Sequence, residues 1–76
     1  MQRIFTAEYE TGARIEVLFH EEALPGECEA DRIQVLLTSM DSERHGWLMT
    51  VNEAHDLRTG VDLAIERAQK YGLGLE

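Results

Sequence analysis

The sequence predicts an α+β fold, in which an antiparallel meander of three to four strands is followed by one long C-terminal helix packed on one sheet face. Apolar and polar residues alternate through much of the first 49 positions, as they do in half-buried strands. From residue 50 to residue 73 the apolar residues instead recur every three or four positions, the spacing of a helix with one apolar side. With 76 residues, of which 43 % are hydrophobic, the chain is expected to form a single domain over 1–76, in the order β-β-β-β-α.

The first two strands are expected at residues 2–9 and 13–20, joined by a three-residue loop that ends at Gly12. Glycine suits the left-handed third position of such a loop. This register gathers one apolar face, expected to lie under the helix, from Phe5, Ala7, Tyr9, Ile15 and Val17. A two-residue loop would mix apolar and charged residues on both faces, so the three-residue loop is favoured.

The next segment, residues 21–31, reads EEALPGECEAD and holds five acidic residues and no basic ones. Its Pro25-Gly26 pair predicts a type II turn, because proline presets the first central backbone angle and glycine allows the second. We therefore expect an exposed connection whose length, above that of most loops, suggests a use.

A third strand is expected at residues 32–39, with Ile33, Val35 and Leu37 on the helix-covered face and Leu36 on the other. A polar turn over 41–46 leads to a short fourth strand at 46–49. This last strand would run directly into the helix.

The helix has both of its ends specified by sequence. Thr50 and Glu53 form a Thr-x-x-Glu capping box, and Gly72 suits the left-handed residue that ends a helix in a Schellman motif. Gly60 is unusual, since glycine within a helix costs about 1 kcal/mol relative to alanine. Either the helix tolerates this cost or another element packs closely at that point.

A helix can cover only one face of the sheet, so the other face should be open. The expected register brings Ile4 beside Leu18 there, and Leu36 points the same way. Three large aliphatic side chains on an open face are typical of an interaction patch. We therefore expect Ile4, Leu18 and Leu36 to form an interface for a partner or for a homodimer, although single exposed aliphatic residues are also ordinary.

The chain carries 15 acidic and 7 basic side chains, which gives a net charge of −8. Such a charge opposes direct contact with nucleic acid or anionic membrane. It favours a basic protein partner, for which the candidate contacts are Glu21, Glu22, Glu27, Glu29 and Asp31. Clustered carboxylates can imitate a nucleic-acid backbone, as in phage-encoded inhibitors of defence systems such as anti-CRISPR proteins; this is an analogy of size and charge, without a shared motif. The alternative is that the acidic segment is only a solvated connection.

Catalysis and cofactor binding find little support in the sequence. Cys28 lies among carboxylates, which oppose formation of a nucleophilic thiolate. His20, Glu22 and Cys28 match no familiar zinc spacing. We expect a protein that is not an enzyme and binds no cofactor or metal. The rival hypotheses are a small-molecule or metal-binding module between residues 21–31 and the helix, and an oligomeric small enzyme with its site at the subunit boundary.

The cytoplasm is the expected location of this protein. No apolar run approaches the roughly 20 residues needed to cross a membrane, and no signal peptide opens the sequence. The single cysteine is typical of a reducing compartment.

Overall fold

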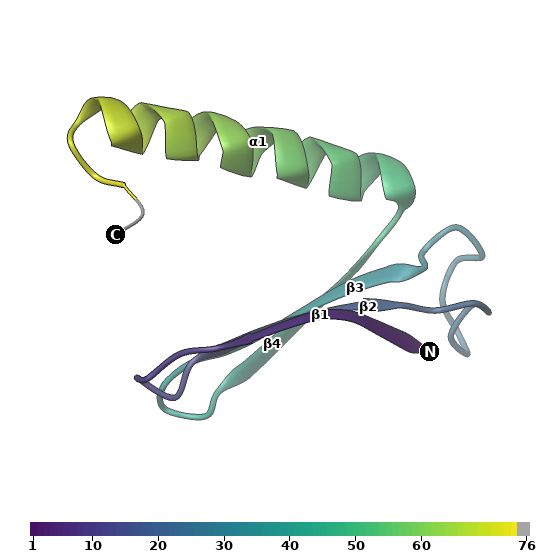
Figure 1. The fold of residues 1–76 in the computed structure, drawn as a ribbon. Coiled ribbons are helices and arrows are strands. Elements are labelled where there is room, and N and C mark those ends of the chain that lie inside the picture. Colours follow the sequence, from purple (N-terminus) through teal and green to yellow (C-terminus); the bar gives the residue numbers. More distant parts are fainter. Residues whose placement is uncertain (75–76) are drawn as a thin grey trace.

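A computed structural model describes residues 1–74 of the chain. Its elements are β1 (Gln2–Glu8), β2 (Arg14–Phe19), β3 (Ile33–Thr38), β4 (Arg44–Met49) and α1 (Val51–Lys70) (Figure 1). The strands form one antiparallel meander in the order β1-β2-β3-β4, and a C-terminal helix follows. The predicted α+β class and element order are therefore confirmed, with β4 starting two residues earlier than expected.

The hairpin of β1 and β2 has the predicted loop and, over most of its length, the predicted register. Phe5 lies opposite Val17 and Ala7 opposite Ile15. Beyond the strands, the Tyr9 amide donates to the Ala13 carbonyl at 3.0 Å. Gly12 has a φ of 93°, the left-handed conformation that the three-residue loop requires.

The pairing at the start of β1 differs from the prediction. The register shifts between Arg3 and Phe5, so that Arg3, and not Ile4, lies opposite Leu18. Ile4 is the extra residue of a β-bulge, which redirects the side chains that precede it. The shift has an electrostatic consequence: the Arg3 Nε lies 3.3 Å from the Glu16 carboxylate of β2.

Directly opposite residues share a face of the sheet, so the register sorts the strands into two faces. We call the face on the side of α1 the inner face; it is apolar except for Gln2 and His45 and consists of Gln2, Phe5, Ala7, Ile15, Val17, Phe19, Ile33, Val35, Leu37, His45, Trp47 and Met49. The outer face is mixed and carries Arg3, Thr6, Glu8, Arg14, Glu16, Leu18, Gln34, Leu36, Thr38, Arg44 and Leu48. The predicted inward side of β3 is confirmed by this pairing.

The ends of α1 are capped as the sequence predicts. The Thr50 amide donates to the Glu53 carboxylate at 2.8 Å, and the Glu53 amide donates to the Thr50 hydroxyl at 3.1 Å. At the other end, Gly72 has a φ of 84° and the Leu73 amide donates to the Ala68 carbonyl at 3.1 Å. These bonds form a capping box and a Schellman motif, so the helix is well specified by local interactions.

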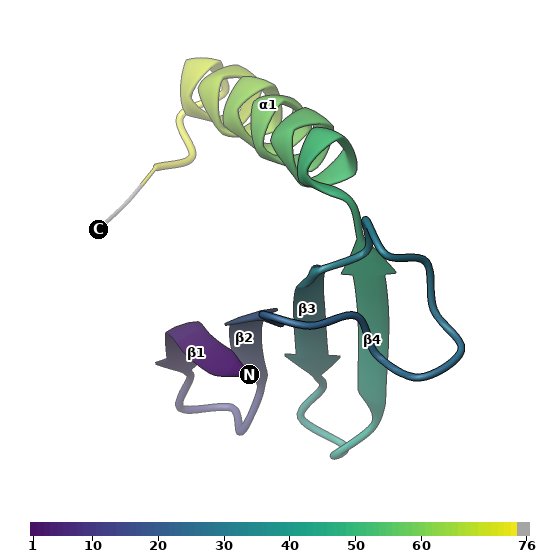
Figure 2. The ribbon, with the colours of Figure 1, turned by 90° about the vertical axis from the view of Figure 1, so that its right-hand side faces the viewer.

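The position of α1 relative to the sheet is the main departure from expectation. The helix passes over the inner face without resting on it (Figures 1 and 2), and none of its residues 51–70, all of them described, is buried. A single residue, Thr50, separates β4 from α1, and Met49 before it is buried. The strand end and the capping box together set the direction in which the helix leaves the sheet.

Two global dimensions show how open this arrangement is. The accessible surface is 6295 Å² for a chain of 8.7 kDa, whereas a compact chain of that mass exposes about 4,700 Å². The radius of gyration is 14.5 Å, against about 11 Å for a compact domain of this length. The chain thus exposes about 1,600 Å² more than a closed fold would.

Candidate protein-interaction surfaces

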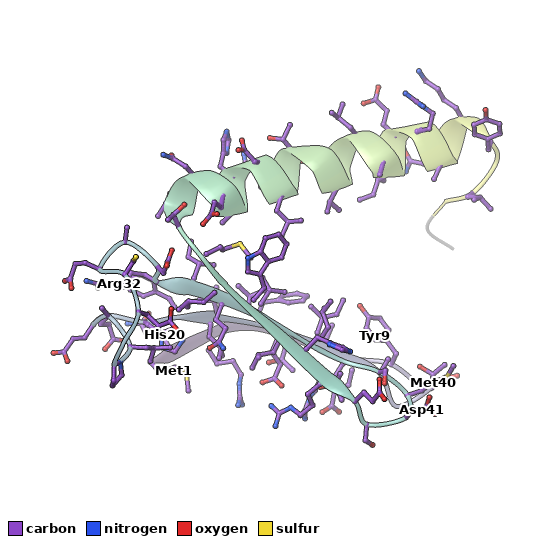
Figure 3. All side chains as sticks on the ribbon, turned by 180° about the vertical axis from the view of Figure 1, so that it is seen from behind. Met1, Tyr9, His20, Arg32, Met40 and Asp41 are labelled. Carbon is purple, nitrogen blue, oxygen red and sulfur yellow. The ribbon has the colours of Figure 1, made fainter. Side chains whose placement is uncertain are left out.

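A groove of about 540 Å³ separates α1 from the sheet near the start of the helix. Trp47 of β4 forms its sheet side, and the helix side is formed by Glu53, Asp56, Leu57, Gly60, Val61 and Ala64. Side chains of both elements project into the space between helix and sheet (Figure 3). Trp47 is 59 % exposed and Leu57 39 % exposed, so these facing side chains leave each other largely open to water.

The inner face is the broadest apolar surface of the sheet, and much of it is open. Phe5, Phe19, Leu37 and Trp47 are all exposed, and they come from four different strands that lie side by side. An extended apolar surface of this kind marks an interaction site more often than single exposed apolar residues do.

The apolar side of α1 faces the groove and continues beyond it. We call this side the helix stripe; it consists of Ala54, Leu57, Gly60, Val61, Ala64, Ile65 and Ala68. Towards the C-terminal end a second hollow is lined by Ile65, Ala68, Gln69, Leu73 and Gly74. The carboxylates of Glu53 and Asp56 border the groove at the other end, so the stripe has an acidic N-terminal edge.

The predicted patch of Ile4, Leu18 and Leu36 does not form an open apolar surface. Leu18 is only 6 % exposed, and Leu36 is half-buried. The Leu36 side chain lies over Gly46 of β4. A Cβ atom added at Gly46 would be only 2.9 Å from the Leu36 Cδ2. Ile4 is exposed, but it occupies the bulge. The predicted pairing of Ile4 with Leu18 was wrong, because the bulge places Arg3 opposite Leu18. Whether Ile4 or Leu36 contacts a partner stays a prediction.

Those long side chains form an ion-pair cluster around Glu16, which is 4 % exposed. The Arg3 Nε lies 3.3 Å from Glu16 Oε2, and the Arg14 Nε lies 3.0 Å from Glu16 Oε1. Arg14 also reaches the Glu8 carboxylate at 3.4 Å. The Arg14 Nε and Glu16 Oε1 are close but not aligned for a hydrogen bond. The cluster compensates the burial of Glu16, which would be costly for an isolated carboxylate.

The acidic loop, residues 21–31, is held by Arg32, whose role could not be read from the sequence. The Arg32 guanidinium donates to the carbonyls of Glu29 and Glu21, both at 2.6 Å, and to the Glu29 carboxylate at 2.7 Å. The Glu21 carboxylate lies 3.4 Å from the N-terminal ammonium group of Met1. The predicted turn is confirmed, since the Glu27 amide donates to the Leu24 carbonyl at 3.0 Å and Gly26 has a φ of 82°.

Two of the five predicted acidic contacts are therefore engaged within the chain. Glu22, Glu27 and Asp31 make no ion pair with any residue in the range 1–74. Arg32, His20 and Met1 lie together at the end of the sheet that carries this loop, opposite the end with Tyr9 and Met40 (Figure 3). Whether the acidic loop binds a basic partner stays a prediction.

The residues considered for metal binding are placed as follows. His20 is buried, and its Nε2 lies 2.9 Å from Gln34 Oε1, while Cys28 is exposed. Over the described part of the chain, no three His, Cys, Asp or Glu side chains gather as a metal site would require. A hollow beside the acidic loop is lined by Met1 and residues 20–25, without a contribution from α1.

No protein-family model matches the chain, and no curated protein or solved structure is significantly similar to it. Among residues 1–74, no helix is long and apolar enough to cross a membrane.

Proposed function

We propose that this chain is a non-catalytic protein-interaction domain, whose inner face and helix stripe are completed by contact with another protein chain. The observation that carries this proposal is the surplus of about 1,600 Å² of exposed surface. If half of that surplus is apolar, its burial stabilises by up to about 20 kcal/mol at about 25 cal/mol per Å². Association itself costs roughly 4–15 kcal/mol in lost translational and rotational freedom, so covering these surfaces would still favour association.

We further propose that the completed domain acts as an inhibitor or adaptor that binds a basic protein surface in the cytoplasm. The net charge of −8 and the three loop carboxylates without an ion pair within 1–74 support a basic partner. Like charges make direct binding of nucleic acid unfavourable. A protein surface that binds nucleic acid is basic, so its charge is complementary to that of this acidic chain.

The test is to capture partners from a lysate with the wild-type chain and with two variants. One variant changes Glu22, Glu27 and Asp31 to their amides; the other changes three acidic residues elsewhere, Glu43, Asp62 and Glu66, to theirs. The captured protein is then purified and its Kd measured at low and physiological salt. We expect only the loop variant to lose affinity, and the wild-type affinity to fall as salt screens the exposed charges over about 8 Å. Equal affinity of all three proteins would overturn the basic-partner proposal.

A further inference from the structure

We infer that the chain completing these surfaces is a second copy of the same protein, and that the two copies exchange their helices. In this arrangement α1 of each copy lies with its helix stripe on the inner face of the other copy. The inference rests on the proposed function, because it names what covers the apolar surfaces. The charged loop of each copy is left facing outward.

The exposed area fits a dimer of this kind. Each chain exposes about 1,600 Å² more than a compact chain of its mass, so two chains together have about 3,200 Å² to bury. Permanent homodimers bury roughly 2,000–5,000 Å² in total and have the more apolar interfaces. A small weak contact would leave most of the open surface in water.

The shapes of the two surfaces are also complementary. The inner face carries bulky aromatic side chains, Phe5, Phe19 and Trp47. The helix stripe is rich in small residues, with Ala54, Gly60, Ala64 and Ala68 set among the larger aliphatic ones. Large side chains on one surface and small ones on the other allow interdigitation at native packing density. At about 1.5 Å per residue, the 20-residue helix is about 30 Å long, enough to span four strands roughly 5 Å apart.

The connection between β4 and α1 explains why a second copy is needed. Thr50 alone links the two elements; it holds the capping box, and Met49 before it is buried. Lowering α1 onto its own sheet would have to bend the chain at this residue and disturb the cap. Short connections between elements favour exchange of an element between protomers, in which the same contacts form between two chains. A two-fold dimer makes each contact twice, so both inner faces are covered.

The first experiment measures the mass of the purified protein by sedimentation over low to high micromolar concentration. We expect about 17 kDa, twice the chain mass of 8.7 kDa. Leu57→Glu places a charge in the helix stripe and should give an 8.7 kDa species, whereas Leu63→Glu should leave the dimer intact. Leu63 is the matched control, because it is 62 % exposed and points away from the stripe on the same helix. A wild-type mass of 8.7 kDa at all concentrations would overturn the inference.

The second experiment tests the exchange itself, and uses cross-linking between two differently labelled chains in a Cys28→Ser background. One chain carries Val61→Cys on the helix stripe, and the other carries Leu37→Cys on the inner face. After mixing by unfolding and refolding, a short bismaleimide reagent should join the two chains. Leu63→Cys in place of Val61→Cys should give much less product. If a chain bearing both cysteines is instead linked only within itself, α1 lies on its own sheet and the exchange is overturned.

The two proposals fail in different ways. A monomer that still captures a basic protein would overturn the exchanged dimer and leave the proposed function standing. A dimer whose loop carboxylates contribute nothing to binding would support the exchange and overturn the basic-partner proposal. Circular dichroism of every variant shows whether a lost dimer reflects a lost interface or a lost fold.

Discussion

The two faces of the sheet are built from the same four strands but differ in how far their large side chains are buried. On the outer face, Arg3 and Arg14 reach the buried Glu16, and Leu18 beside it is buried as well. On the inner face, Phe5 and Trp47 remain exposed. The outer face is completed within one chain, and the inner face is not.

The difference follows from the side chains that each face carries. Long amphipathic side chains such as arginine can lie along a sheet, cover neighbouring apolar surface and keep their charged ends in water. Aromatic and aliphatic side chains of the inner face have no such option, so they need a second layer. A mixed face can therefore be stable in water without a second layer. An apolar face must instead be covered by another element of the chain or by another protein.

The largest expected effect is on the outer face. Leu18→Ala should lower the free energy of unfolding by about 2–5 kcal/mol, because it removes a buried side chain and leaves a cavity. If the outer face is complete within one chain, the loss should be the same at low and high protein concentration. Urea unfolding at two concentrations measures it, with the exposed Leu63→Ala as the control. A loss that grows on dilution would show that the outer face also depends on association.

The next effect concerns the junction that sets the direction of α1. Thr50→Ala removes the hydroxyl that accepts the Glu53 amide and should destabilise by about 1 kcal/mol. Asp62→Ala, on the exposed side of the same helix, should change stability by less than about 0.5 kcal/mol. Thermal unfolding compares the two. Equal effects would mean that the cap does not hold the junction.

A substitution at Gly60 distinguishes most directly between a groove that stays open and a groove that is filled by a partner chain. In the single chain, a Cβ at this position would meet nothing within 4 Å. Gly60→Ala should therefore stabilise α1 by up to about 1 kcal/mol if the groove stays open. If a partner's aromatic side chain occupies the groove, the added methyl group crowds it and weakens association instead. Unfolding and sedimentation of the variant decide between these outcomes, with Thr59→Ala as the control away from the stripe.

The local structure of the chain could be predicted from sequence because its signals are local. The capping box at Thr50, the left-handed Gly12 and the alternation around Val17 each specify a few neighbouring residues, and each was confirmed. The bulge at Ile4 could not be predicted, since the alternation of apolar residues is equally compatible with a regular pairing there, and the Arg3–Glu16 ion pair that accompanies the bulge joins two strands. Nor could the gap between α1 and the inner face, because an apolar stripe indicates burial without saying which chain provides the cover.

The smallest expected effect on stability concerns the acidic loop. Glu29→Gln removes the 2.7 Å contact with Arg32, but the Glu29 side chain is exposed, and ion pairs of that kind contribute roughly 0–1 kcal/mol. The guanidinium keeps its bonds to the carbonyls of Glu29 and Glu21, so the loop should hold its shape. Arg32→Gln removes all three bonds and should loosen the loop, which amide hydrogen exchange over residues 21–31 would detect. If Glu29→Gln loosens the loop as much as Arg32→Gln does, the carboxylate and not the pair of carbonyls holds it. The charge of the loop would then be needed for its shape, and its effect on a basic partner could no longer be separated from its effect on the fold.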